Sequence, residues 1–469
     1  MESNKIPFHE IDFLLPVHRF AIEFSYIAKR GLPFIREFTL RLIHLAPMPP
    51  ESLARYLDLS SRELKEVLRD LVDKDELTYC DDGLIDLTTR ARGYFVAEGD
   101  SPQVTSIETK NITLSFELAG FNCIGKNVAR DGWHAGISVP ISGENWGLSD
   151  KYASKGFQAQ FYHLLELDYM PDIAPKDAET LPSIYKMNAV TRVGQGNKRL
   201  PHTFYFDDFG NVVEREDLNE FKYDEPVFDA VTRAINKLQQ VNNLSDVADA
   251  MQAVGDNVTG EFISSSGIDV SSLIREIARS RESESKLQLM LGPIYQEGNW
   301  HYIKSGLISE LKQLKEQHQD GVKELIWLAP SDSFWGKSDR YTTVKSWLEE
   351  SAMTTGNNPK RLFKPKFYYP IARESDHRGI KEWRHLLTYK ENCYKFIEGF
   401  LKGTTEVLLL EDSFATVCYH LSIPSISSVS IPLAFYTNDK AQVNTLEELI
   451  KDYLGGSVGF ENPIDLGKL

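Results

Sequence analysis

The spacing of apolar residues along the chain is most regular between residues 50 and 96. Four side chains follow the i, i+3, i+4, i+7 pattern of a helix with one buried face: Leu64, Val67, Leu68 and Leu71. Ser60 precedes this run and Glu63 lies three residues later, which is the spacing of a capping box at a helix N-terminus. The pattern predicts a helix over 61–73, with a shorter helix and a tight turn before it.

Turn residues follow this helix. Asp81, Asp82 and Gly83 stand between the short segments ELTY and LIDL, as in a β-hairpin. The order of helix, LDLS turn, capped helix, hairpin and LTTRARGYF resembles a winged helix-turn-helix domain over about residues 33–97. The resemblance implies a three-helix fold with a β-hairpin wing.

A winged helix implies a recognition helix that offers cations to DNA. Arg62, Lys65 and Arg69 lie within about 60° of one another on a helical wheel, opposite the leucines. Carboxylates occupy the neighbouring helix surface and the hairpin tip: Glu66, Asp70, Asp73, Asp81 and Asp82. The sequence leaves open whether this domain contacts DNA or serves protein contacts and dimerisation.

The periodicity predicts an α+β multidomain protein with an N-terminal winged helix, a β-rich middle domain and a C-terminal α/β domain. We expect N-terminal helices and the winged helix in 1–98, β-rich structure with a trailing helix in 104–253, a linker in 254–284 and the α/β domain in 285–469.

Three finer expectations accompany this division. Two apolar-periodic stretches in 8–46 predict two helices, and the segment FDDFGN predicts a hairpin turn. The alternation after residue 285 predicts a largely parallel sheet, with one of its helices over 387–402.

Composition limits the function classes. The formal charge is −16, so nucleic-acid contact requires a local patch of cations. The four cysteines are scattered without a CxxC pair, which favours a reducing cytoplasm over a disulfide framework or a zinc site. We find no signal peptide and no apolar run of membrane-spanning length, so we expect a cytoplasmic protein.

Motifs that support catalysis are missing from the sequence. The segment GFNCIGKN at 120–127 nearly matches the phosphate loop GxxxxGK[ST], but Asn127 replaces the hydroxyl residue and no helix is predicted after it. We prefer a strand followed by a turn here. Neither HExxH nor GxSxG occurs, and no histidine is assigned a catalytic role. We therefore expect the protein to have no enzymatic activity and to bind no cofactor or metal ion.

The segment 359–402 is basic within an acidic chain, with eleven Lys or Arg against five Asp or Glu. Its cations alternate with aromatic residues, which is a pattern found in grooves that bind single-stranded nucleic acid. We expect Phe363 and Phe367 to face the core while the cations and one tyrosine form the surface. The candidate contacts are Lys360, Arg361, Lys364, Lys366, Tyr368 and Arg384. The alternative is an ordinary solvated strand edge.

The order of strands and turns in 404–438 is similar to the second half of a phospholipase-D-like domain. That family carries H-x-K-x₄-D, in which the histidine attacks phosphorus and the lysine holds the phosphate. Thr404, Glu406 and Glu411 occupy the corresponding positions, and no HxK occurs in the chain. The resemblance therefore implies a degenerate domain without that chemistry, and a generic α/β sheet is the alternative.

These observations predict a non-enzymatic, nucleic-acid-engaging subunit, with DNA as the favoured ligand, in a larger prokaryotic complex whose ATPase or nuclease is a separate protein. Antiviral genome defence or DNA maintenance is the setting suggested by analogy. Two alternatives stay open: a winged-helix transcription regulator with a ligand-sensing α/β domain, and a phospholipase-D-like phosphodiesterase with an atypical site.

Overall fold

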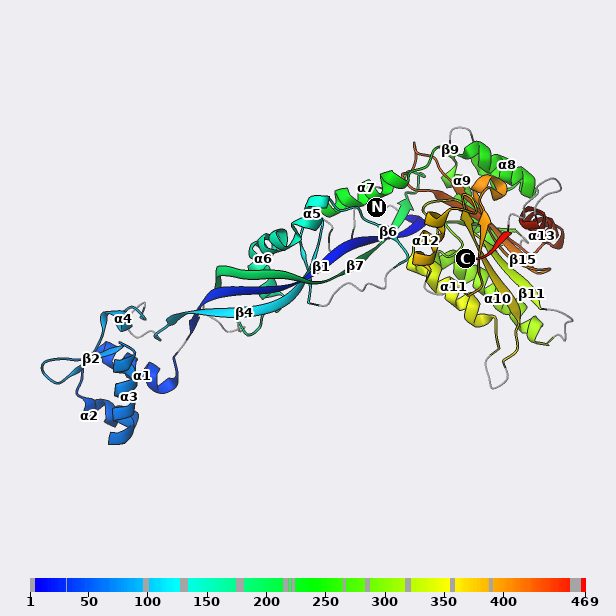
Figure 1. The fold of residues 1–469 in the computed structure, drawn as a ribbon. Helices are drawn as coiled ribbons and strands as arrows, with labels where there is room; N and C mark the ends of the chain where they lie inside the picture. Colours follow the sequence, from blue (N-terminus) through cyan, green and yellow to red (C-terminus); the bar gives the residue numbers. More distant parts are fainter. Residues whose placement is uncertain are drawn as a thin grey trace.

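The computed structural model describes residues 5–30, 32–95, 101–126, 134–173, 181–213, 218, 221, 224–264, 267–282, 287–316, 322–354, 359–387, 391–455 and 465–469. The protein is elongated, with a small helical module at one end, a long β arm, and a compact α/β domain at the other end (Figure 1). Within the described residues no helix is long and apolar enough to cross a membrane.

The arm is built on one strand, β1 (Ile6–Arg30). β7 (Ser183–Phe206) pairs antiparallel with it from Ile6 to Ile27. β4 (Val104–Glu117) pairs antiparallel with its distal half, from Val17 to Arg30. The short strands β5 (Cys123–Gly125) and β6 (Ile137–Ser138) complete a five-stranded sheet. One face of the distal sheet packs against α6 (Ser149–Glu166), which follows the short α5 (Gly143–Gly147).

The expectation of two helices in 8–46 is wrong for its first half, because β1 occupies that stretch. Alternate residues of distal β1 are buried, as in a strand with one covered face: Phe20, Ile22, Phe24, Tyr26 and Ala28. Nearer the start of the strand, Phe13, Leu14 and Leu15 are all buried, so both faces are covered there. Continuous apolar residues of this kind resemble a helix in sequence, which explains the error.

The distal module, residues 32–95, has the predicted order of elements: α1 (Phe34–Leu45), α2 (Pro50–Leu57), α3 (Ser61–Asp73), β2 (Leu77–Tyr79), β3 (Ile85–Leu87) and α4 (Thr89–Arg92). The capping box is confirmed, since Ser60 N–H donates to Glu63 Oε2 at 2.8 Å and Glu63 N–H donates to Ser60 Oγ at 3.3 Å. The leucines of α3 lie in a core that belongs to the module alone.

The C-terminal domain contains an eight-stranded sheet in the order β10-β16-β15-β14-β11-β12-β13-β17. Its strands are β10 (Leu287–Leu291), β11 (Lys323–Leu328), β12 (Phe363–Ile371), β13 (Cys393–Ile397), β14 (Thr405–Leu410), β15 (Phe414–Leu421), β16 (Ile431–Thr437) and β17 (Asp465–Lys468). Among neighbouring strands only β11 with β12 and β12 with β13 pair in parallel, so the sheet is mixed and not largely parallel as expected.

Helices cover both faces of this sheet. α10 (Glu297–Glu316) and α11 (Asp339–Ser351) pack on one face, and α8 (Leu244–Val254) and α13 (Lys440–Gly455) pack on the other. The helix expected over 387–402 is wrong: α12 (His377–Leu386) ends before it, and β13 and the short helix η3 (Phe400–Gly403) occupy that stretch. Residues 388–390 lie outside the described part.

The segment 254–284, expected as a linker, contains the short helix η2 (Thr259–Phe262), the two-residue strands β8 (Ile263–Ser264) and β9 (Gly267–Ile268), and α9 (Val270–Glu282). Val270 and Leu273 are buried in the same core as the C-terminal sheet. α7 (Glu225–Leu238) contributes to this core as well. The described residues of this segment therefore pack against the C-terminal domain and do not form a free connection. The FDDFGN turn is confirmed by the bond from Asp207 N–H to Asn211 O, at 2.9 Å.

Charged groups fix the start of the arm to the C-terminal domain. Arg340 Nε donates to both carboxylate oxygens of Glu10 at 2.7 Å. Arg199 of β7 contacts Asp12 at 3.2 Å and Asp339 at 2.9 Å, which ties both long strands to the N-terminus of α11. The arm therefore extends from a defined point on the domain.

We predict that Phe157→Ala destabilises the arm selectively. Phe157 is fully buried, and its ring lies 5.0 Å from that of Phe24 on β1. Removing a buried phenylalanine ring costs about 3–5 kcal/mol. Hydrogen exchange of the β1 and β7 amides should accelerate accordingly, while the C-terminal sheet keeps its protection. Tyr162→Ala on the exposed side of the same helix is the control, and equal effects of the two substitutions would contradict the packing described.

Candidate functional site

The predicted recognition residues share an exposed face of α3. The side chains of Arg62 and Arg69 are 90% and 85% exposed, and Lys65 between them is also exposed. Arg62 pairs with Glu66 at 3.4 Å and Arg69 with Asp73 at 3.7 Å, each one helical turn away. Such exposed pairs contribute little and break at small cost, so the cations stay available to a ligand.

The charge around this face is not uniformly positive. The distal module holds nine Lys or Arg and twelve Asp or Glu, a net charge of −3. Asp81 and Asp82 at the hairpin tip are both exposed. The exposed carboxylates make the hairpin tip unsuited to phosphate contact.

A second surface of the module is apolar. Phe34 and Leu45, at the two ends of α1, are 68% and 70% exposed, and Phe38 between them is 36% exposed. The rings of Phe34 and Phe38 lie 4.5 Å apart. Large apolar side chains gathered on one face of a short helix are typical of a protein-contact surface.

The basic segment 359–369 differs from its predicted form at two residues, Lys366 and Tyr368. The pattern predicts that Lys366 is exposed together with Lys364, but the Lys366 side chain is only 20% exposed. Phe363 and Phe367 are buried, as expected. Tyr368 is also buried, with its hydroxyl donating to Asp465 Oδ2 at 3.0 Å, so the predicted stacking of this ring on a base is wrong. The strand is covered on both faces, and the simple alternation of exposed and buried residues does not hold there.

The cations of this segment are unequal. Lys364 and Lys366 share one carboxylate, Glu324, at 3.7 and 2.6 Å, which offsets part of their charge. Lys360 and Arg361 are exposed before β12, and Arg384 is exposed in the last turn of α12. These residues lie on the C-terminal domain, at the opposite end of the molecule from α3 (Figure 1). The structure does not bring the two predicted surfaces together.

A buried polar cluster occupies the C-terminal sheet. His420 of β15 lies between two carboxylates: its Nδ1 is 2.9 Å from Asp332 Oδ2 and its Nε2 is 3.2 Å from Glu406 Oε2. Ser430 Oγ donates to Asp332 at 2.6 Å, and the Trp327 indole N–H donates to Glu406 Oε1 at 2.8 Å. Every member of this cluster is buried.

The electrostatics of the cluster favour a charged imidazole. Burial alone lowers the pKa of His420, but neighbouring Cys418, Asp332 and Glu406 raise this pKa well above its usual value. For Asp332, burial alone raises the pKa. The hydrogen bond and charge of His420 nevertheless lower this pKa below its usual value. His9 of β1 is also buried, but its pKa shifts in the opposite direction from that of His420, because burial lowers the His9 pKa to about 4.

No motif in the sequence predicted the cluster around His420. Its only signal is polar residues inside otherwise apolar strands, Glu406 in TEVLLL and His420 in FATVCYHL. Of the positions matched to the phospholipase-D-like motif, Thr404 donates its hydroxyl to Leu401 O and Glu411 accepts the N–H of Glu324. Only Glu406 belongs to the cluster, as an acceptor rather than a phosphate-binding cation.

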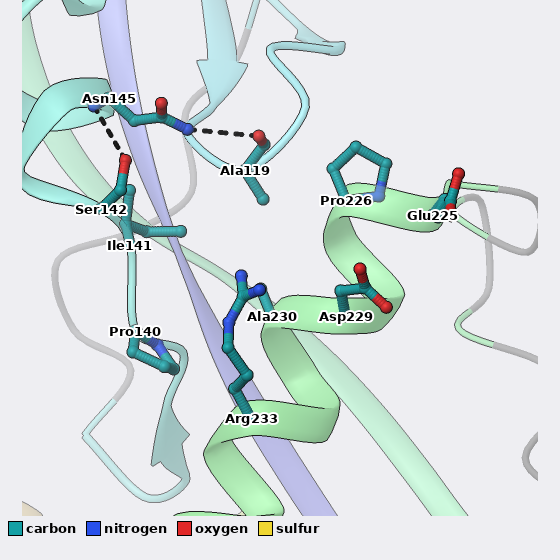
Figure 2. A pocket seen from close by; sticks show the side chains of 10 residues that line it. All are labelled: Ala119, Pro140, Ile141, Ser142, Asn145, Glu225, Pro226, Asp229, Ala230 and Arg233. Carbon is teal, nitrogen blue, oxygen red and sulfur yellow. Dashed lines mark hydrogen bonds between the residues drawn. The ribbon is translucent and has the colours of Figure 1, made fainter.

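Two surface hollows lie on the described part of the molecule. One of about 350 Å³ lies beside α7, where Figure 2 shows Arg233, Asp229 and Glu225 opposite Ser142 and Asn145. Asn145 Nδ2 already donates to Leu118 O at 2.7 Å. The other, of about 420 Å³, follows the outer side of α11 beside Trp347. Within the segment GFNCIGKN (120–127), Cys123–Gly125 form β5, and the chain from Asn127 to residue 133 lies outside the described residues.

Comparisons with known proteins add little to this geometry. No family model matches the sequence. No curated protein matches it either. Among solved structures, a phospholipase D family member, Nuc from Salmonella typhimurium, is 6% identical, with 32% of this chain and 87% of that chain covered and a TM-score of 0.19. A likeness at that TM-score carries no argument about fold or chemistry. No winged helix is shown by these comparisons, so that assignment stays a prediction.

We predict that Asp332→Ala strongly destabilises the C-terminal domain. The substitution leaves His420 with one carboxylate and leaves the Ser430 hydroxyl without its acceptor. Breaking a buried ion pair from one side costs about 3–5 kcal/mol. Urea unfolding followed by tryptophan fluorescence measures this loss. Glu382→Ala, which breaks the exposed pair with Arg378, is the control and should change little; a similarly small effect of Asp332→Ala would contradict the role of the cluster.

Proposed function

We propose that this chain is a non-enzymatic subunit that engages nucleic acid through a winged-helix module held at the tip of the β arm. The observation that carries the proposal is the exposed cationic face of α3, with Arg62, Lys65 and Arg69 turned away from the module's core. In this proposal α3 enters a major groove of DNA, and its cations contact phosphates and base edges.

The arm holds the cationic face of α3 away from most of the protein's negative charge, so that this face can approach a polyanion. Removing the module's −3 from the total of −16 leaves −13 for the rest of the chain, of which residues 96–284 carry −12 and residues 285–469 carry −1. A 25-residue strand spans roughly 80 Å at about 3.3 Å per residue. The Debye length is about 8 Å at physiological salt, so negative charges farther than this from α3 are largely screened.

The absence of enzymatic activity is proposed from the buried cluster. Thr404 holds the position matched to the motif histidine. His420 is the one histidine within 404–438, and both of its ring nitrogens face carboxylates in a site closed to solvent. A nucleophilic histidine requires a free nitrogen beside the substrate. We therefore assign turnover to a separate ATPase or nuclease partner, in a prokaryotic assembly such as an antiviral defence or DNA-maintenance complex. In this assembly Lys360, Arg361 and Arg384 supply secondary phosphate contacts.

We predict that the triple charge reversal of Arg62, Lys65 and Arg69 to Glu abolishes most duplex binding. Lost phosphate and base contacts each cost about 1–3 kcal/mol. Fluorescence anisotropy with a labelled duplex should show at least a tenfold weaker Kd, and the salt dependence should flatten by about 0.9 per lost phosphate contact. The module should stay folded, because its leucine core is untouched.

The matched control reverses Arg275, Arg279 and Arg378 instead. These cations are exposed on α9 and α12, and Arg378 pairs with Glu382 one helical turn away, as Arg62 pairs with Glu66. Both triple variants change the net charge by −6. Equal loss of affinity in the two variants would reveal a general charge effect, and unchanged affinity in the α3 variant would reassign the module to protein contacts.

A second candidate function, a dimeric transcription regulator, is favoured by the apolar face of α1. Consider two α1 helices packed antiparallel about a two-fold axis. Phe34 of one copy then faces Leu45 of the other, and Glu37 of one copy lies near Arg41 of the other. Glu37 and Arg41 already pair within one helix at 3.3 Å. An isologous interface needs this kind of self-complementarity. The sensing domain of such a regulator is less supported, since both surface hollows are shallow and one lies outside the α/β domain.

We predict that Phe34→Ser with Leu45→Ser separates these functions. Burying such side chains stabilises a contact by about 1.5–3 kcal/mol each, so a dimer formed by α1 should weaken at least tenfold in sedimentation equilibrium. Tyr56→Ser, which removes an equally exposed aromatic residue on α2, is the control. A wild-type chain that is already monomeric at micromolar concentration would exclude the dimeric regulator.

A further inference from the structure

Three potential metal ligands of different types meet on one face of the C-terminal sheet. Glu406 on β14 lies directly opposite Cys418 on β15, and His420 is two residues further along the same strand. Residues two apart share a face, so all three side chains project to the same side. Their donor oxygen, sulfur and nitrogen atoms lie within 4.8 Å of one another, and all three residues are at most 2% exposed.

We propose that Glu406, Cys418 and His420 bind a divalent transition-metal ion, with zinc best suited to this ligand set. Zinc accepts carboxylate oxygen, thiolate sulfur and imidazole nitrogen in tetrahedral sites. Two donors on a tetrahedral ion with bonds of about 2.0 Å are separated by about 3.3 Å. The distance of 3.2 Å between His420 Nε2 and Glu406 Oε2 already has this value.

The surroundings of these ligands have the arrangement that orients metal-binding side chains. A histidine that binds metal through one nitrogen usually donates its other N–H to a carboxylate. Here Nδ1 of His420 faces Asp332 at 2.9 Å, and Asp332 is itself held by Ser430. The Trp327 indole N–H donates to Glu406 Oε1, and the other carboxylate oxygen, Oε2, faces the His420 imidazole.

His9 provides an independent sign that this region is incomplete. Its ring is fully buried, and neither ring nitrogen has a hydrogen-bond partner among the described residues. The charges of Asp332 and His420 both act on it. Buried polar groups without partners are rare in folded proteins, and an ion or water that belongs nearby is one established reason for them. Because the centre is closed to solvent, we assign the ion a structural role that ties β14 to β15.

Cobalt(II) is the probe that tests this proposal, because thiolate coordination gives it a charge-transfer absorption band. The full-length chain, dialysed against chelator, should take up one Co²⁺ per chain with that band, and added Zn²⁺ should displace it. Cys418→Ser should lose the band. Cys393→Ser is the matched control, since Cys393 is also a buried cysteine of this sheet, and it should keep the band.

A measurement on the wild-type chain keeps the test independent of variant folding. Zinc-edge X-ray absorption of the loaded protein should show one sulfur neighbour together with nitrogen or oxygen neighbours, and its melting temperature should rise with Zn²⁺ concentration. Failure of the wild-type chain to retain stoichiometric metal, a coordination shell without sulfur, or a cobalt band that survives Cys418→Ser would each overturn the proposal. None of these outcomes depends on nucleic-acid binding.

Discussion

The pairing of β1 along both of its edges is the constraint on which the rest of the structure depends. A strand of 25 residues exposes a long row of N–H and C=O groups unless both edges are covered. β7 covers one edge from Ile6 to Ile27, and β6 and β4 cover parts of the other. The chain therefore builds a continuous ladder from the C-terminal domain to the distal module, and a ladder of this length resists bending better than an irregular connection.

This ladder separates two kinds of polar surface that would interfere if they were adjacent. At the distal end, cations on α3 are solvated and only weakly paired with carboxylates on the same helix. At the other end, the charges of Asp332, Glu406 and His420 are enclosed within the sheet and satisfied by one another. The first arrangement suits recognition of an external polyanion, whereas the second suits a fixed internal centre. The ion pairs of Glu10, Asp12, Arg199 and Arg340 hold the arm on the domain between them.

Local signals in the sequence predicted the elements of the distal module and most elements of the C-terminal domain. The Ser60–Glu63 capping box and the α3 leucines act within a few residues, and the structure confirms both. Errors arose where distant residues decide the outcome. Phe13 to Leu15 form a strand because β7 and β6 pair with it, and Tyr368 is buried because Asp465 and Tyr394 lie against it. The His420 cluster joins residues up to 98 positions apart, beyond the reach of any spacing rule.

In the proposed function, nucleic acid binds at the tip of the arm. Hydrogen exchange of the full-length chain, with and without a saturating DNA duplex, tests it most directly. We expect new protection in α3 and the turn before it, with the exchange of the C-terminal sheet and the proximal arm unchanged. Protection confined to β12 and α12, or no change anywhere while the duplex is bound, would contradict it.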